Sequence, residues 1–188
     1  MSRPGTYAKG AAKRLEILEA AHAVLAREGY RNSSLRSIAR SLGMEPAHIL
    51  YYFGSREELL REVIERWDAD SRRAHESLDA LDGFAEAVRR NVGIPGIVHT
   101  YLTFAAEAVD PAHPAHQYFI DRFERTRAEL SAAIADGQVA GTLRAALDPD
   151  RTARTLIAVS DGLQLQALVD PGVDAVADMA AAMADLRV

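Results

Sequence analysis

The sequence contains no cysteine, so disulfide bonds and metal sites built on thiolates are both excluded. It also lacks an apolar run of about 18 residues, the length that a membrane-spanning helix requires. Residues 1–7 carry no apolar segment of the kind that directs secretion. These absences predict a cytoplasmic protein without disulfide bonds and without a membrane partner.

Alternating apolar and polar residues, the pattern of a half-buried strand, are absent as well, and no internal repeat is visible. Apolar residues recur instead at helical spacing along most of the chain. The 188 residues suffice for one large domain or two small ones. We therefore predict an all-α protein of about nine helices from the periodicity.

The net charge of −5 is distributed unevenly along the chain. Residues 1–54 carry a net charge of +4, whereas residues 55–188 carry −9. A basic end on an acidic body is typical of a nucleic-acid-binding unit attached to a unit that does not touch nucleic acid. We predict two domains. The charge favours DNA binding for residues 1–54, and the composition of the later helices favours ligand binding and dimerisation for residues 55–188.

Residues 33–53 show the clearest local pattern in the chain. Apolar residues at the i, i+3, i+4 and i+7 spacing of one helix face predict a helix over about residues 34–42. These residues are Leu35, Ile38, Ala39 and Leu42. Ser33 or Ser34 can cap its start. Gly43 follows at the point where the chain must turn, since glycine reaches positive φ at little cost.

A second helix is predicted to begin at Pro46, because proline suits the first turn of a helix, where its missing N–H costs nothing. The residues expected on its inner side are Ala47, Ile49, Leu50 and Phe53. A helix, a short turn with glycine and a second helix together form the helix-turn-helix motif. The second helix of that motif enters the major groove of DNA.

Seven further helical segments follow from the same periodicity, and a break is expected at residues 81–83. Ser55 and Glu58 form a capping-box pattern at the start of the long segment over residues 56–80. The segments cover about residues 10–28, 56–80, 84–91, 97–109, 115–140, 148–169 and 174–186.

Three stretches of the sequence resemble the TetR family of bacterial transcriptional regulators. They are residues 34–40, 42–44 and 49–60. Residues 113–119 and 161–166 are similar to one C-terminal subgroup of that family. The resemblance implies a homodimeric, ligand-responsive repressor that binds a palindromic operator in double-stranded DNA and is released by a small-molecule effector. Glu45, Pro46 and Leu50 depart from the family pattern, so no operator sequence is implied.

Phosphate contacts hold such a motif on DNA, and contacts to base edges select the sequence. The predicted phosphate contacts are Ser33, Ser34, Tyr52 and Arg56. Arg36 is predicted to reach a guanine or a phosphate. The residues predicted to face base edges are Ala47, His48 and Tyr51. The alternative for Arg36 is a solvated helix face, and the alternative for one of the two tyrosines is packing in the core.

Polar and aromatic side chains interrupt the apolar helices of the second domain. A buried polar group without a partner costs free energy, so these side chains are candidates for a small-molecule site between helices. The predicted ligand contacts are Trp67, His99, Phe104, Tyr118, Phe119, Phe123 and Gln164. Tyr101, Glu107 and Asp161 share the pattern. The alternative for each residue is a place in the core.

The last two predicted helices offer more apolar and alanine surface than one bundle can hide. Two such helices from each of two chains would pack together, and the twofold symmetry would present two recognition helices to a palindromic operator. The predicted dimer contacts are Leu156, Val159, Leu163, Val176, Met179 and Met183.

His113 and His116, with Asp110 nearby, have a spacing that a metal site could use. Pro111 and Pro114 place them in a loop that enters a helix, so we interpret them as helix-start residues and predict no metal and no cofactor. The sequence shows no nucleophile elbow and no phosphate-binding loop, so we predict that the protein is not an enzyme. The alternative is a helical small-molecule carrier or enzyme whose N-terminal domain is only structural.

Overall fold

The computed structural model describes residues 4–188, with side chains described from Lys9 onward, and this part of the chain forms nine α-helices. The β-type pairing in it is an isolated bridge between Leu143 and Arg187. The all-α prediction is confirmed. Among the described helices, none is long and apolar enough to cross a membrane. The helices are α1 (Pro4–Asn32), α2 (Leu35–Ser41), α3 (Pro46–Phe53), α4 (Arg56–Ala74), α5 (Ala80–Val92), α6 (Pro95–Glu107), α7 (His116–Val139), α8 (Pro149–Val169) and α9 (Ala175–Ala184).

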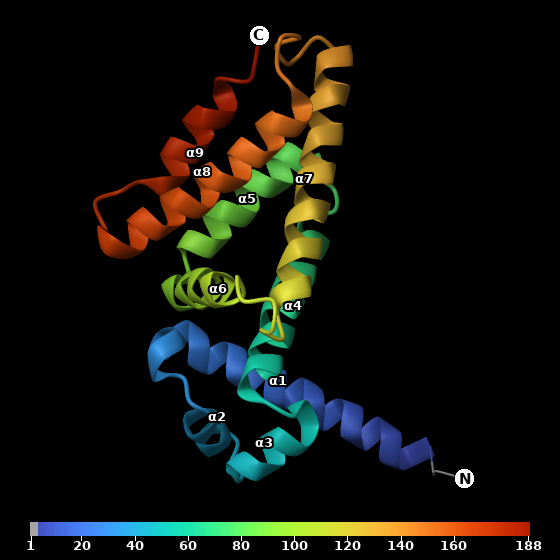
Figure 1. Ribbon diagram of the computed structural model, residues 1–188, viewed down its shortest axis with the longest axis vertical. Helices are drawn as coiled ribbons and strands as arrows, with labels where there is room; N and C mark the ends of the chain where they lie inside the picture. The colour runs from blue at the N-terminus through green and yellow to red at the C-terminus, as the bar shows by residue number, and fades with distance from the viewer. Residues whose placement is uncertain (1–3) are drawn as a thin grey trace.

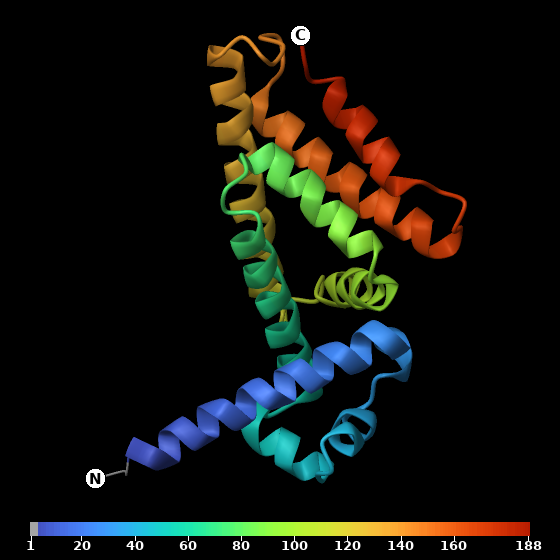
Figure 2. The same cartoon turned by 180° about the vertical axis from the view of Figure 1, so that it is seen from behind.

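The helices gather in two parts that α4 connects (Figure 1). The first part contains α2 and α3, which lie under α1, and the second contains α5, α7, α8 and α9. α6 crosses between α1 and the helices of the second part, as Figure 2 shows from behind. Any change in the position of α6 therefore acts on both parts.

One hydrophobic core joins the two parts, because its buried residues extend from α1 through α4 and α6 to α7. They include Ile17, Leu25, Ile38, Ile49, Leu60, Phe104 and Phe119. A second core holds α5, α7, α8 and α9 together. The predicted domain boundary between residues 54 and 55 thus falls where the first core continues. Of the predicted N-terminal domain, residues 1–3 lie outside the described chain.

The helix-turn-helix forms as its local sequence predicts. Ser34 caps α2: its hydroxyl accepts from the Ser37 N–H, and the Ser37 hydroxyl accepts from the Ser34 N–H, which completes a capping box. Gly43 adopts a φ of 62° in the turn, and Pro46 occupies the first turn of α3. The inner side of α3 was predicted wrongly in part, because Ala47 and Leu50 are exposed. At about 100° per residue, Ala47 lies on the side of the helix away from the buried Ile49, and Leu50 lies about 100° around the helix from Ile49.

Two other boundaries differ from the prediction. α1 extends from Pro4 to Asn32, beyond the expected residues 10–28, with a kink at Gly29, whose φ is 71°. α4 ends at Ala74, and the break expected at residues 81–83 lies inside α5. The reason is that the Asp79 carboxylate accepts from the Asp82 N–H and caps α5 early, so Gly83 is carried within a helix.

Candidate functional site

The exposed side of α2 and α3 forms one candidate surface. Ser34, Arg36, Ala47 and His48 are exposed there. Tyr51 projects furthest, with 83% of its surface accessible to solvent. An aromatic side chain with this exposure contributes nothing to the core, so its place on the second helix of the motif suits contact with a partner.

Tyr52 lies between this surface and the core. It is half-buried and packs against the first core, and its ring meets that of Tyr51 edge-on, with ring centroids 5.2 Å apart. Its carbonyl accepts a hydrogen bond from Arg14 of α1. The structure therefore fixes Tyr52 in place while leaving Tyr51 free.

Ser33 is buried and Arg56 is half-buried, with its guanidinium bound to backbone carbonyls. Ser33 is 1% exposed, and its hydroxyl donates to the Gly29 carbonyl at 2.6 Å. The Arg56 guanidinium donates to the carbonyls of Tyr30 and Ser33 at 3.1 Å each. It also lies over the Tyr30 ring at 4.7 Å. These contacts tie the end of α1 to the start of α4 and hold the loop before α2.

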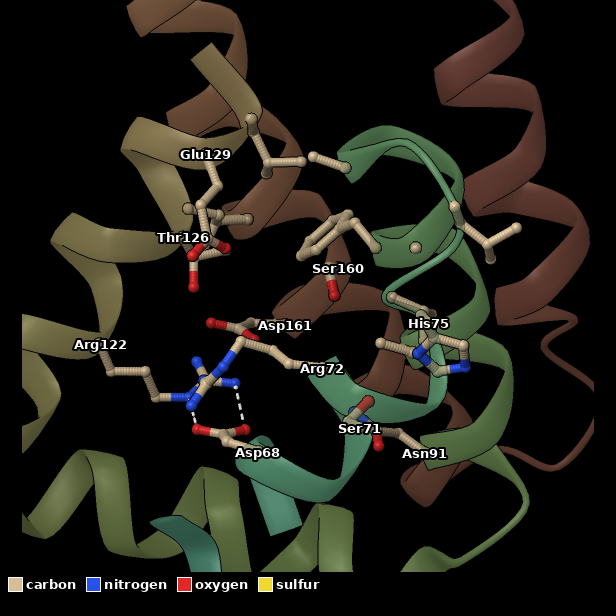
Figure 3. Close-up of a pocket in the computed structure, with 18 of the residues that line it drawn as sticks. Asp68, Ser71, Arg72, His75, Asn91, Arg122, Thr126, Glu129, Ser160 and Asp161 are labelled. Atoms are coloured by element: carbon tan, nitrogen blue, oxygen red, sulfur yellow. Dashed lines mark hydrogen bonds and ion pairs between the residues drawn. The ribbon is translucent and has the colours of Figure 1, made fainter. Parts of the chain in front are cut away.

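The second candidate site is a cavity of about 290 Å³ between α4, α5, α7 and α8, whose lining also includes Tyr101 of α6 (Figure 3). Its wall mixes apolar side chains with charged ones. Charged and polar residues in the lining are Asp68, Ser71, Arg72, His75, Asp79, Asn91, Arg122, Thr126, Glu129, Ser160, Asp161 and Gln164. Aromatic residues in it are Trp67, Phe84 and Tyr101.

A polar network crosses this cavity. Arg122 of α7 binds Asp68 of α4 through two N–H groups, at 2.6 and 3.2 Å (Figure 3). Arg122 also donates to the Tyr101 hydroxyl at 3.0 Å. The Tyr101 hydroxyl in turn donates to the Asp161 carboxylate at 3.2 Å. Tyr118 donates to Asp68 from outside the lining, at 2.7 Å.

Burial shifts the titration of these groups. It raises the pKa of the Tyr101 and Tyr118 hydroxyls, so both remain protonated and act as donors. Burial also raises the pKa of Asp161, while the nearby charge of Arg122 lowers it. Asp161 accepts only from Tyr101 among the described residues and takes part in none of their ion pairs. Its carboxylate is therefore the least compensated buried charge of the cavity.

Gln164 and Ser160 line the cavity one turn apart on α8 and are 3% and 4% exposed. The Gln164 amide nitrogen donates to the Ser160 carbonyl at 3.1 Å and to the Ser160 hydroxyl at 3.0 Å. Its amide oxygen, Oε1, is buried and has no hydrogen-bond partner among the described residues. A buried acceptor without a donor costs free energy, which a ligand that donates to it would recover.

Two of the predicted ligand contacts, Trp67 and Gln164, line this cavity. The other five lie outside its lining, because they pack in or beside the first core or against α1. Phe104 and Phe119 are buried in that core, and Tyr118 and Phe123 pack at its edge. His99 faces α1, where a methyl group added to Gly29 would lie 3.2 Å from its Nδ1.

The lining includes charged residues that the sequence did not single out. Asp68 and Arg122 are 54 positions apart, and each looks like an ordinary polar position of an amphipathic helix. No local pattern marks such a pair. Tyr101 and Asp161 did carry a signal, because each is a polar group within an apolar helix.

α6 connects the cavity to the helix-turn-helix. Tyr101 reaches the cavity from α6, and the Tyr30 hydroxyl of α1 donates to the Glu107 carboxylate at the end of α6. Glu107, which the sequence grouped with the ligand candidates, is thus a contact between α1 and α6. The cavity and the exposed face of α3 are linked through two helices in direct contact.

Some of the predicted dimer contacts are buried within the single chain, and the others are half-buried. Leu156 and Met179 are buried in the second core of the single chain. Val159, Leu163, Val176 and Met183 are half-buried. The outer face of α8 also exposes Leu165 and Val169, by 52% and 80%, and a shallow groove on it is lined by Val159, Gly162 and Leu163. α8 is thus not covered on both faces within one chain.

His113 and His116 make contacts within the loop before α7. The backbone N–H of Ala115 donates to His113 Nδ1 at 3.2 Å, and His116 Nδ1 lies 2.8 Å from the Ala108 carbonyl. Within the described residues, no group of three or more His, Asp or Glu side chains is arranged to hold a metal ion.

Two family models match the sequence. The model of bacterial regulatory proteins of the tetR family matches residues 17–63, and the model of the C-terminal part of BetI-type transcriptional repressors matches residues 84–186. A comparison with curated proteins gave no match.

Solved structures share the fold over nearly the whole chain. A putative transcriptional regulator from Saccharomonospora viridis, solved in complex with choline, is 26% identical, with 93% of this chain and 95% of that chain covered and a TM-score of 0.72. A TetR transcription regulator from Haloarcula marismortui is 22% identical, with coverages of 94% and 97% and a TM-score of 0.77. A putative TetR-family regulator from Rhodococcus sp. is 21% identical, with coverages of 93% and 98% and a TM-score of 0.74. The last two are likenesses of fold alone.

Proposed function

The chain belongs to the TetR family of bacterial transcriptional regulators, and we propose from this that it is a repressor that leaves a palindromic operator when a small molecule fills the cavity between α4, α5, α7 and α8. The protein is a ligand-responsive DNA-binding regulator. Regulators of this family are generally non-enzymatic, and we assign no catalytic role to the cavity. The observation that carries the proposal is the continuous core, which contains Ile49 and Phe53 of α3 together with Trp67 and Tyr101 of the cavity lining.

We propose that the DNA-binding surface consists of the exposed predicted residues Ser34, Arg36, Ala47, His48 and Tyr51. Ser34 and Arg36 lie at the start of α2, where exposed N–H groups and a guanidinium suit phosphate. Ala47, His48 and Tyr51 belong to the helix that enters the major groove in this motif. Ser33 and Arg56 act instead as supports that hold α2 against α1 and α4.

The proposed effector site is the cavity. Its volume of about 290 Å³ suits a small organic molecule. The choline complex of the Saccharomonospora viridis protein supports a small organic effector. We propose that a ligand between α4 and α7 moves α6 and α4 relative to α1 and so changes the positions of the two α3 helices in the dimer. The effector releases DNA only to the extent that it prefers the conformation that does not bind DNA.

We propose that the dimer forms through the outer face of α8 together with α9. Exposed Leu165 and Val169 and the shallow groove beside Val159 and Leu163 support this choice. Burying such apolar area against a second copy follows the usual symmetry of homodimers, in which the same patch serves both chains. Leu156 and Met179, which fill the core of one chain, would support the interface from beneath.

The decisive experiment is DNase I protection of the DNA upstream of the gene, with purified protein at low salt, where phosphate contacts are strongest. We expect a protected palindrome whose half-sites are about one helical turn, or a multiple of it, apart. Sedimentation at micromolar concentration should show a dimer. Absence of protection at any site would reject the proposal, and a carrier or enzyme would then show ligand binding or turnover without any effect on DNA.

A further inference from the structure

We propose that the effector of the cavity is a small protonated amine that is recognised through its N–H donors by Asp161 and Gln164 of α8. This inference rests on the proposed function in one respect, since it takes the cavity to be the effector site. It goes further by naming the chemical class of the effector and the atoms that receive it.

The first observation is the unpartnered oxygen of Gln164. The side chain is 97% buried, its nitrogen is fixed by Ser160, and its Oε1 has no donor among the described residues. The donation to the Ser160 hydroxyl and carbonyl fixes the amide so that the nitrogen faces Ser160 and the oxygen is left over. A ligand that satisfies this atom must supply an N–H or O–H group.

The second observation is the carboxylate of Asp161, three residues before Gln164 on the same helix. It accepts only from Tyr101 among the described residues, and Arg122, the nearest buried cation, is engaged by Asp68. Asp161 and Ser160 both line the cavity, and Figure 3 shows the Asp161 carboxylate on the side where the guanidinium groups of Arg72 and Arg122 are drawn. An incoming positive charge would compensate Asp161 in a site where water screens little.

The balance of charge in the lining agrees with a cation. Once Arg122 and Asp68 are paired, the lining retains Asp79, Glu129 and Asp161 as carboxylates that take part in no ion pair of the described chain. The remaining guanidinium of the lining is that of Arg72, and the side chains of Arg72, Asp79 and Glu129 are all exposed. An anion would therefore meet more negative than positive charge.

The aromatic residues separate a protonated amine from a quaternary ammonium ion. Quaternary ammonium has no N–H and is bound in proteins by the faces of several aromatic rings. Here the Trp67 ring already carries the Arg90 guanidinium at 3.9 Å and the stacked His22 ring at 5.0 Å. The Tyr101 ring carries the Arg122 guanidinium at 4.5 Å. Phe84 is the remaining aromatic residue of the lining, so the rings do not form an open cage.

The spacing of the two acceptors suits one ammonium group. Residues three apart on a helix have Cβ atoms about 5–6 Å apart on the same face. A primary ammonium has three N–H donors and can reach both the carboxylate and the amide oxygen from a point between them. The remaining volume of the cavity would hold a short aliphatic chain against Leu130, Ile157 and Phe84.

The experiment compares four small probes of similar size on the full-length protein at neutral pH: n-butylamine, 1,4-diaminobutane, choline and n-butanol. Binding is followed by thermal shift and by the fluorescence of Trp67, the single tryptophan of the chain, which lines the cavity. We expect both amines to raise Tm and change the fluorescence. We expect choline to bind at least tenfold more weakly, and butanol to have no effect.

Two variants identify the atoms. Asp161→Asn keeps an acceptor for Tyr101 but removes the charge, and we expect the affinity for both amines to fall at least tenfold. Gln164→Leu removes the free oxygen, and we expect a several-fold loss for the amines with no change for choline. Asp121→Asn makes the same chemical change at an exposed position of α7 outside the lining. This control should change neither the affinity for the amines nor the affinity for choline.

The wild-type probe series decides the matter even if a variant fails to fold. Choline binding as tightly as the amines, or n-butanol binding as tightly as either amine, would overturn the proposal, as would the lack of any amine effect. Operator protection measured on the same protein without any probe tests the proposed function separately. A protein that protects its operator yet ignores amines remains a repressor with another effector class.

Discussion

Gly96, in the first turn of α6, lies so close to the carbonyl oxygen of Leu25 in α1 that a Cβ atom at position 96 would overlap it. Helices approach this closely only where one of them has no side chain at the contact. The contact lies at the junction of the helix-turn-helix part with the helices that carry the cavity (Figure 2). It gives a direct way to test whether the position of α6 controls DNA binding.

The first prediction concerns that contact. Gly96→Ala must push α6 away from α1, and we expect the free energy of unfolding to fall by about 1–3 kcal/mol, the usual effect of adding a methyl group to a packed site. Operator affinity should change as well, because α6 and α1 would move apart.

The matched control is Gly10→Ala on α1, where nothing lies within 4 Å of the added methyl group and alanine favours the helix. Thermal unfolding and an electrophoretic mobility shift measure both effects, and equal behaviour of the two variants would contradict the prediction.

A second prediction separates DNA contact from stability at Arg36. This side chain is exposed on α2 and forms no hydrogen bond or ion pair among the described residues. Arg36→Ala should leave the free energy of unfolding within about 0.5 kcal/mol of its starting value. Operator binding should weaken by about 1–3 kcal/mol if Arg36 reads a base, or the salt slope should fall by about one if it binds phosphate. Unchanged affinity at low salt would remove Arg36 from the DNA-binding surface.

Arg56 should behave in the opposite way. Its guanidinium holds the carbonyls of Tyr30 and Ser33 and stacks on the Tyr30 ring. Charged hydrogen bonds of this kind contribute about 1.5–3 kcal/mol each, so Arg56→Ala should clearly destabilise the protein in chemical denaturation. Arg56→Lys should recover only part of the loss, because lysine lacks the planar fork. A variant that loses DNA binding with full stability would instead make Arg56 a phosphate contact.

The fourth prediction concerns the ion pair of Arg122 and Asp68, which lies at the edge of the cavity with both side chains mostly buried. Arg122→Met would leave the Asp68 carboxylate without its charged partner, and we expect a loss of about 3–5 kcal/mol in the free energy of unfolding. Adding Asp68→Leu should restore a part of it, since the uncompensated charge is then removed as well. A double variant no more stable than Arg122→Met would contradict this account.

The fifth prediction is a pH dependence at Asp161. Burial raises the pKa of Asp161 above its ordinary value of 3.8, so the folded protein binds a proton over a pH range in which the unfolded chain does not. Stability is therefore lost as pH rises from about the ordinary carboxyl range through the raised pKa. Asp161→Asn removes this loss, so the variant should be more stable than the wild type at neutral pH. The difference should shrink as pH falls through the raised pKa and be absent below the ordinary carboxyl range, and urea titrations at several pH values measure it. A difference that does not depend on pH would show that the carboxylate titrates normally.

Local chemistry made several features predictable from the sequence. The capping box of Ser34 and Ser37, the turn at Gly43 and the start of α3 at Pro46 each depend on residues within one helical turn. The start of α8 is also fixed by neighbouring residues, because Asp148 is its N-cap and Pro149 is its first residue. Interactions of this range are encoded by spacing alone, so the helices and the helix-turn-helix could be read directly.

Interactions within one helical turn do not determine which side chain contacts which distant residue. Arg122 meets Asp68 across 54 residues, and Phe104 fills the core although it looks, in the sequence, like Trp67, which lines the cavity. Arg56 follows the motif directly, yet its guanidinium turns inward to the Tyr30 carbonyl. The free oxygen of Gln164 exists only because Ser160 takes the nitrogen of the same amide.

By itself, the sequence determined that this protein is all-helical and that residues 33–53 form a DNA-binding motif, because helix periodicity, caps and turns act between near neighbours. Only the tertiary structure decided where the cavity lies, which charges in it are paired and which residues of α2 and α3 are exposed. Those outcomes depend on how distant helices pack, because packing decides whether a buried charge lies beside a charged partner.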